Sequence, residues 1–205
     1  MPNLVAPRGF VPSRYRDGSC WNGAVNMYFI PAADTNQYNP GDAVKSAAGG
    51  DANGIPQVAK ITNGTDTARG VIIGILVANP GAPSLVGINL DLTVQNTPGA
   101  GKTHDYYVLV CDDQNVLFEL QDDGITTANL VAASCNKNAS FTVANPVSPR
   151  QNSATVLLSS SIAVTQALPL KLMGLVQKPN NAYGANATWL VMFNQHEFQG
   201  NTAGI

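Results

Sequence analysis

The chain has 205 residues, of which 44% are hydrophobic and only 12% are charged, and its net charge is −2 at pH 7. This length and apolar content are enough for one packed domain and exclude wholesale disorder. The charge balance excludes a protein that wraps nucleic acid, which needs a concentrated basic face. The low charged fraction suits a surface that neighbouring proteins partly cover.

Residues 1–23 are predicted to form an extended N-terminal arm. Pro2, Pro7 and Pro12 recur every five residues, which disfavours both a helix and a central strand. Arginine and large aromatic residues, which anchor many interfaces, lie among and after these prolines. Such an arm is expected to lie along its own domain or a partner, and the alternative is a frayed terminus. The residues predicted to contact a partner or a neighbouring copy are Arg8, Phe10, Arg14, Tyr15, Arg16 and Trp21.

The N-terminal sequence, MPNLVAPRGF, contains no basic region followed by an apolar core, so no signal peptide is predicted. The longest strongly apolar run, Val71–Ala78, is far shorter than the roughly 20 residues that span a bilayer. We therefore expect the protein to be made in the cytosol. Cys20, Cys111 and Cys135 are widely spaced, and we expect free thiols, with one disulfide as the alternative.

Residues 24–205 are predicted to form a single all-β domain, either a sandwich or a barrel, of which a jelly roll is one form. Candidate strands recur with turn signals at intervals of roughly 8–12 residues. Thr126–Ser134 alone has a helical leaning, and Ala47–Gly54 is predicted to be a loop because it lacks core-forming side chains. Besides the segment discussed next, the predicted strands are Ala24–Ile30, Asp42–Ser46, Val58–Thr62, Arg69–Ala78, Leu85–Gln95, Ser140–Ala144, Ala154–Ser159, Ile162–Thr165, Leu170–Gln177 and Thr188–Asn194.

The segment Tyr106–Gly124 is predicted to be the central β-hairpin of the domain. Two runs rich in β-branched and aromatic residues, Tyr106–Val110 and Val116–Leu120, flank a turn of polar residues. Its acids favour turns, although carboxylates in this density could instead bind a cation or act as acids and bases. The acids concerned are Asp112, Asp113, Glu119, Asp122 and Asp123.

A phosphate-binding loop is the sharpest alternative among the motifs. Residues 96–103 read NTPGAGKT and end in Gly101, Lys102 and Thr103, as such a loop does. The required first glycine is replaced by Asn96, and the following residues favour a strand where the mechanism needs a helix. We predict a flexible hairpin loop and no bound nucleotide.

Two histidines, His104 and His196, and no hydrolase motif argue against an enzyme. Structural or surface roles are expected for both. We therefore predict no catalytic residues, no cofactor and no bound metal.

The stretches YYVLVCDDQNVLFELQDDG, LKLMGLVQKPNNAYGANATWLVMFNQHEF and the final NTAGI resemble a group of structural proteins of tailed-bacteriophage virions. Members of this group are regarded as capsid decoration, or cement, proteins. The resemblance runs from Arg69 to the end of the sequence and is looser in the N-terminal segment. It implies a compact β domain that carries no chemistry and binds capsid subunits as a small symmetric oligomer.

The expected function is thus that of a non-enzymatic cement protein on the outer surface of a phage head. Its expected partners are the major capsid protein and other copies of itself, as a dimer or a trimer, with neither nucleic acid nor membrane. The first alternative is a β domain of a tail or head fibre that binds host-surface carbohydrate. The second is an enzyme that uses Asp112, Asp113 and Glu119 as acids.

Overall fold

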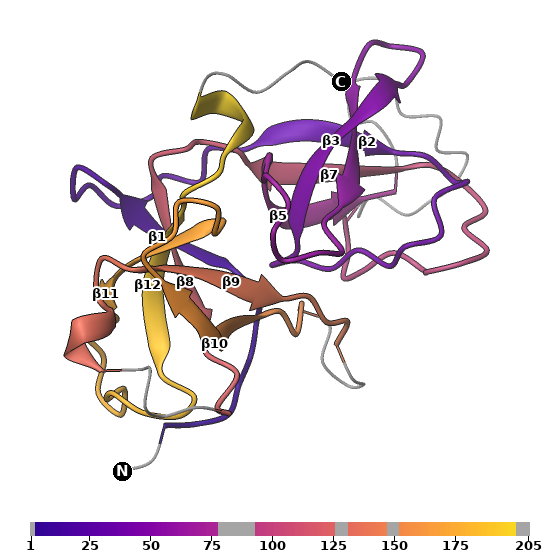
Figure 1. Cartoon of the computed structure of the whole chain (residues 1–205). Coiled ribbons are helices and arrows are strands. Elements are labelled where there is room, and N and C mark those ends of the chain that lie inside the picture. Colours follow the sequence, from indigo (N-terminus) through magenta and orange to yellow (C-terminus); the bar gives the residue numbers. More distant parts are fainter. Residues whose placement is uncertain (1–2, 78–92, 126–130, 147–151, 200–205) are drawn as a thin grey trace.

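The computed structural model describes residues 3–77, 93–125, 131–146 and 152–199, and these form an all-β protein of two sheets (Figure 1). The predicted fold class is confirmed. In sheet A the strand order is β1-β8-β12-β11-β9-β10. The bounds of these strands are Val11–Tyr15 for β1, Val116–Gln121 for β8, Thr188–Phe193 for β12, Leu170–Leu175 for β11, Asn138–Thr142 for β9 and Val156–Ala163 for β10.

In sheet B the strand order is β3-β4-β2-β7-β5-β6. Because β3 pairs with both β4 and β5, five of these strands close on themselves as a small barrel. The two short 3₁₀ helices of the described residues are η1 (Ala132–Ser134) and η2 (Glu197–Gln199). The strand bounds are Ala43–Gly50 for β3, Pro56–Lys60 for β4, Asn26–Ile30 for β2, Tyr106–Cys111 for β7, Gly70–Leu76 for β5 and Thr93–Val94 for β6.

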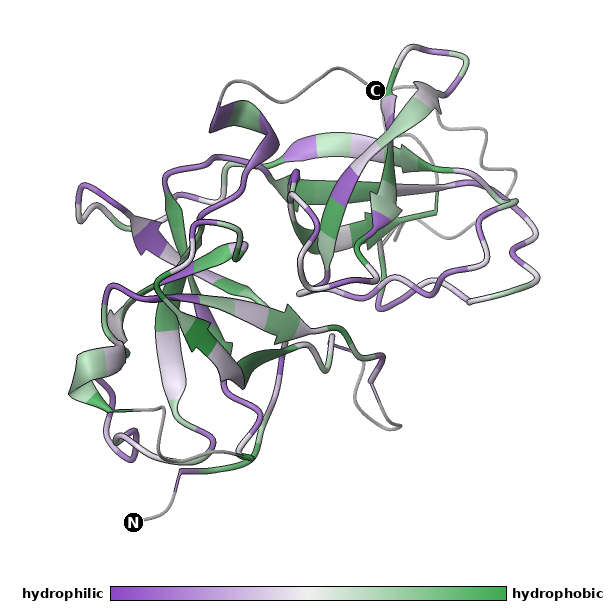
Figure 2. Ribbon diagram, in the orientation of Figure 1, coloured by the Kyte–Doolittle hydropathy of each residue, from purple (hydrophilic) through white to green (hydrophobic). Residues whose placement is uncertain are grey.

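Two main hydrophobic clusters stabilise these sheets, each of which forms one lobe of the molecule. The strands of both lobes carry many hydrophobic residues in Figure 2. The larger cluster contains Phe118 and Trp189 from sheet A together with Val71 and Cys111 from sheet B. It therefore joins the two sheets in one core. The second cluster lies within sheet B and includes the fully buried Ile75.

Apolar runs and turn signals predicted most strands to within a few residues, but the assignments of residues 47–54 and 154–165 were wrong. The predicted loop Ala47–Gly54 begins as strand, because β3 continues to Gly50 and pairs with Pro56 of β4. The two predicted strands Ala154–Ser159 and Ile162–Thr165 are largely one strand, β10, with an irregular register after Leu158. Residues 85–92 and 126–130, which belong to two further predictions, lie outside the described residues.

The predicted hairpin Tyr106–Gly124 is not a hairpin. β7 pairs with β2 and β5 in sheet B, whereas β8 pairs with β1 and β12 in sheet A. The polar turn between them therefore carries the chain from one sheet to the other. Two short runs joined by a turn look the same in sequence whether they pair with each other or with other strands.

The N-terminal segment is extended, as predicted, but it belongs to the fold. Val11–Tyr15 is strand β1, and it pairs antiparallel with β8 at the edge of sheet A. Pro12 is tolerated there because an edge strand has one side without strand partners, and the register shifts between Pro12 and Arg14. The boundary predicted at residue 23 thus separates no independent arm from the β domain.

Candidate functional site

The aromatic residues predicted to contact a partner are anchored in the core. Phe10 is only 1% exposed, and its ring centroid lies 5.2 Å from those of Phe141 and Phe193. Tyr15 and Trp21 are partly buried against the same cluster. Phe10 is therefore inaccessible to a partner, which corrects its predicted role: the ring fastens the N-terminal segment to its own domain.

The arginines of this segment have the opposite placement. Arg8, Arg14 and Arg16 are all exposed, and none of them has an ion pair or a side-chain hydrogen bond within the described part of the chain. By contrast, the guanidinium of Arg69 donates to the Tyr28 hydroxyl at 2.9 Å and pairs with a carboxylate. Three cations on one anchored segment are thus free to bind an external group.

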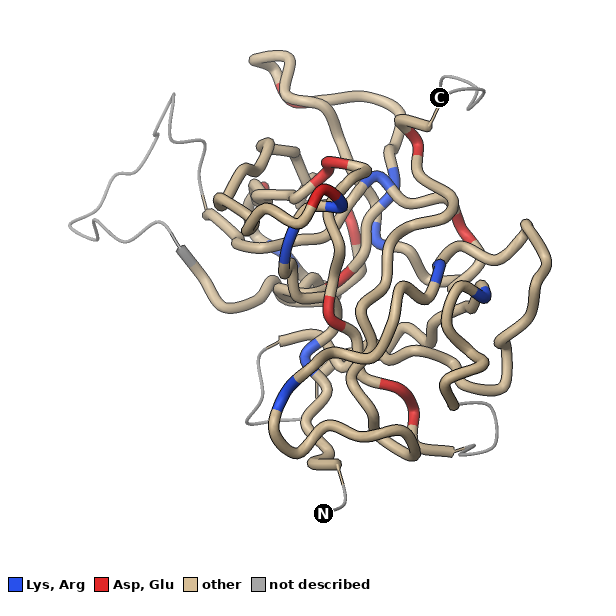
Figure 3. Tube along the Cα trace, turned by 90° about the vertical axis from the view of Figure 1, so that its left-hand side faces the viewer, with Lys and Arg blue, Asp and Glu red and all other residues tan. Residues whose placement is uncertain are grey.

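Charged residues elsewhere on the molecule are sparse and mixed in sign. Blue and red segments are scattered along the trace in Figure 3, and neither sign fills a face. Lys45 and Lys178 are paired with Asp66 and Glu119. The three arginines therefore stand out because they are both exposed and unpaired, and not because of a strong local field.

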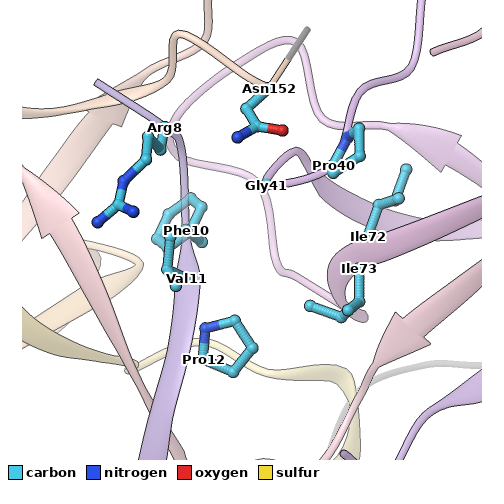
Figure 4. A pocket seen from close by; sticks show the side chains of 9 residues that line it. All are labelled: Arg8, Phe10, Val11, Pro12, Pro40, Gly41, Ile72, Ile73 and Asn152. Carbon is cyan, nitrogen blue, oxygen red and sulfur yellow. The ribbon is translucent and has the colours of Figure 1, made fainter. Parts of the chain in front are cut away.

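A cavity of about 150 Å³ lies beside Arg8, where the N-terminal segment meets sheet B. Figure 4 shows Val11 and Pro12 on one side of it and Ile72 and Ile73 on the other. The two sides are tied together by lining residues, since the Phe10 amide donates to the Gly41 carbonyl at 3.0 Å. The lining is mainly apolar, with Arg8 at its rim.

A second cavity, of about 340 Å³, lies beside Arg16. It is formed by the end of β1, the turn between β7 and β8, the end of β12 and helix η2. Its lining is mainly polar. The lining residues are Arg16, Gln114, Asn115, Met192, Phe198 and Gln199.

The acids considered for catalysis do not converge. Asp112 is buried and accepts hydrogen bonds from sheet B, whereas exposed Asp113 accepts the amide N–H of Asn115 at 2.8 Å. Glu119 forms an ion pair with Lys178 on sheet A. Each carboxylate thus has a separate internal partner, and the three do not form a common site.

The second acidic turn is equally engaged in the fold. Asp122 accepts the amide N–H groups of Gly124 at 2.7 Å and Asn186 at 2.8 Å, and Asp123 accepts the Ser159 hydroxyl at 2.6 Å. Nowhere in the described ranges do three or more His, Cys, Asp or Glu side chains gather as metal ligands. These acids stabilise turns, which is the first of the two interpretations open from the sequence.

Lys102 gives the residues that resemble a phosphate-binding loop a different role. Its ammonium group is buried and donates to the backbone carbonyls of Asp34 at 2.5 Å, Asn36 at 2.6 Å and Gly99 at 3.0 Å. Strand β7 follows, and no helix begins there. The lysine therefore fastens two loops together and cannot reach a phosphate group.

One cluster of polar side chains joins the end of the described chain to sheet B, and no motif predicted it. Asp112 accepts the Tyr28 hydroxyl at 2.5 Å, and Arg69 donates to that same oxygen. Arg69 also pairs with Glu197 at 3.3 Å, and Ser46 donates both its amide and its hydroxyl to the Glu197 carboxylate. These residues lie far apart in the sequence, so only the strand pairing brings them together.

The two histidines do not share a site. His104 is exposed beside Thr103. His196 is buried, and its Nδ1 accepts the amide N–H of Phe198 at 3.2 Å. Burial lowers the pKa of His196, which favours the neutral ring that this hydrogen bond requires. His196 thus has a structural partner, as expected.

The three cysteines are free, with Cys20 exposed and Cys111 buried. Burial raises the pKa of the Cys111 thiol to about 12, so it is an inert core group at neutral pH. The described residues contain no helix that is long and apolar enough to cross a membrane.

No protein-family model, curated protein or solved structure matches this chain.

Proposed function

We propose that this protein is a non-enzymatic decoration, or cement, protein of a phage head, which bridges major capsid subunits through its N-terminal segment. The observation that carries the proposal is the set of three exposed arginines, Arg8, Arg14 and Arg16, which have no internal partner within the described residues. Arginine presents five N–H donors in a rigid fork that fits carboxylates of another protein.

The way these arginines are held supports the proposal. Burial of Phe10 and the pairing of β1 with β8 fix the backbone before any partner binds. A pre-ordered segment loses less conformational entropy on binding than a free arm, so more of the contact energy appears as affinity. Weak individual contacts suffice on a capsid, because many identical copies bind one shell.

The same interface suits partners of two kinds, the major capsid protein and neighbouring copies in a dimer or a trimer. The proposed location is the outer surface of the head, after synthesis in the host cytoplasm. The remaining polar groups support a structural role, because the acids and Lys102 are engaged inside the fold. Carbohydrate binding is the second candidate function, and the cavity beside Arg16 is the specific observation that favours it.

The test is rebinding of purified protein to heads that lack it, measured by co-sedimentation. The triple variant Arg8→Gln, Arg14→Gln, Arg16→Gln keeps Phe10 and β1, whereas deletion of residues 1–16 would remove parts of the core and of sheet A. We expect at least a tenfold weaker affinity, equivalent to about 1.4 kcal/mol, because three interface arginines are lost.

The matched control is the double variant Lys137→Gln, Lys171→Gln, which removes cations that also lack an ion pair within the described residues. It should bind heads like the unchanged protein. Equal binding by the triple variant would refute the proposed contact surface, and a cryo-EM map of the decorated head would show which segment faces the capsid.

A further inference from the structure

The cavity beside Arg16 is large enough to hold a small ligand. Its volume of about 340 Å³ lies within the range of roughly 300–1,000 Å³ that small-molecule sites occupy. The segments that line it are far apart in the sequence, from β1 to η2, and pairing or packing holds each in place. The Arg16 amide, for example, donates to the Asn115 carbonyl at 2.8 Å.

The polar groups of this cavity offer both donors and acceptors. The Arg16 guanidinium and the Gln114 amide make no side-chain hydrogen bonds within the described part of the chain, so their N–H groups are available. Asn115 donates its side-chain N–H to Asp113 at 3.2 Å, and Gln199 donates its own to the Phe193 carbonyl at 3.2 Å. Both amides are thereby oriented, and each retains a carbonyl oxygen as an acceptor.

An aromatic ring supplies an apolar wall. Phe198 is 49% exposed, and the guanidinium carbon of Arg69 lies 4.0 Å from its ring centroid. Arg69 is itself held by Tyr28 and Glu197, so one side of the half-exposed ring has a positioned neighbour. Exposure of an aromatic ring beside free polar groups is an arrangement that a ligand can complete.

We propose that this cavity binds an acidic saccharide, namely a pyranose unit that carries a carboxylate. The carboxylate would accept the paired N–H groups of Arg16, which is a strong and directional contact. The hydroxyl groups both donate and accept, as the Gln114, Asn115 and Gln199 amides require. The C–H groups of one sugar face are weakly positive and suit the negative face of the Phe198 ring.

This ligand class accounts for the polar groups and the Phe198 ring of the cavity better than its rivals. A neutral sugar would leave Arg16 without a counter-charge, and an acidic peptide side chain would leave most of the amides without hydroxyl partners. The inference does not depend on the capsid role, since it concerns the isolated protein and a different ligand.

The experiment is a titration of the ¹⁵N-labelled full chain, followed by ¹H–¹⁵N NMR, with methyl glucuronide, methyl glucoside and glutarate as probes. We expect saturable shifts with the glucuronide at a Kd on the order of 1 mM, located at the side-chain N–H signals of Gln114, Asn115 and Gln199. The glucoside and glutarate should each bind at least tenfold more weakly.

Variants assign the contacts. Arg16→Gln should weaken glucuronide binding at least tenfold, because it removes a charge-assisted hydrogen bond, and Gln114→Ala should weaken it severalfold. Lys137→Gln removes a cation that does not line the cavity and should leave the affinity unchanged. The unperturbed signals of each variant verify its fold.

Three results would overturn the proposal. The first is an absence of saturable shifts, the second is equal binding of glucoside and glucuronide, and the third is unchanged affinity in Arg16→Gln. Glutarate binding as tight as that of the glucuronide would assign the cavity to an acidic peptide side chain instead. None of these results depends on binding to phage heads, so the two proposals are tested separately.

Discussion

The carboxyl group of Asp122 is almost fully buried, and burial raises its pKa to about 6. Its Oδ1 accepts two backbone N–H groups, from Gly124 and Asn186, whereas its Oδ2 is buried without a partner. The hydrogen bonds favour the ionised form, but the cost of removing the charge from water is larger. A turn acid predicted from the sequence thus becomes a group that titrates near neutral pH.

This burial predicts an unusual pH dependence for Asp122→Asn. The unfolded carboxyl loses its proton near pH 3.8 and the folded one near pH 6, so the folded state binds more protons in that window and wild-type stability falls as pH rises through it. Asparagine does not titrate, and its Oδ1 can still accept both N–H groups. The variant should gain about 1–3 kcal/mol relative to wild type between about pH 4 and pH 7.

Urea denaturation of both proteins at about pH 4 and pH 7 measures this gain in the stability of the variant relative to wild type. Any packing effect of the asparagine itself is the same at both pH values and cancels in the comparison. A pH-independent difference between variant and wild type would show that Asp122 titrates at its ordinary pKa in the folded protein.

At the scale of elements, β1 combines an anchor with a presented surface. Phe10 holds the start of the strand in the core, and Arg14 and Arg16 project from the segment that follows. The prolines of this segment predicted an extended conformation correctly. They could not show that the Phe10 ring packs against Phe118, Phe141 and Phe193, which lie in distant parts of the sequence.

Truncation of this anchor should destabilise the protein strongly. Phe10→Ala removes a buried ring from the largest core cluster, and we expect a loss of about 3–5 kcal/mol in the free energy of unfolding. Phe198→Ala is the matched control, because that ring is half exposed and its loss should cost about 1 kcal/mol or less. Chemical denaturation compares the two, and equal losses would argue against Phe10 as the anchor of β1.

At the scale of the whole molecule, the two sheets share one core, and the chain passes from sheet B to sheet A between β7 and β8. The barrel of sheet B also has its own buried cluster. Independent unfolding of the two lobes would expose Val71 and Cys111 of sheet B together with Trp189 of sheet A. Such exposure opposes separation of the lobes.

We therefore expect a single cooperative unfolding transition. Tryptophan fluorescence reports on sheet A through Trp189, and near-ultraviolet tyrosine signals report on sheet B through Tyr28 and Tyr106. The two probes should give coincident denaturation midpoints. Separate midpoints would show that the lobes are two folding units and that the shared cluster couples them weakly.

The sequence by itself determined the properties that depend on residues close together along the chain. Alternating apolar residues and turn signals predicted the all-β class and the approximate positions of most strands, such as Thr188–Phe193. Asn96 stands where a phosphate-binding loop needs its first glycine, and turn preferences predicted a structural use of the acids. These features have short-range causes, so a local pattern is enough to recognise them.

Only the tertiary structure decided which segments meet. Strand partners are chosen by packing across the whole chain, so the apparent hairpin at Tyr106–Gly124 became a connection between sheets. The same pairing buried Phe10, assembled the cluster around Arg69 and placed Arg16 beside Phe198 and Gln114. Residues as far apart as 182 positions are in contact. Such contacts leave no periodic signal in the sequence, because distance along the chain does not limit proximity in the fold.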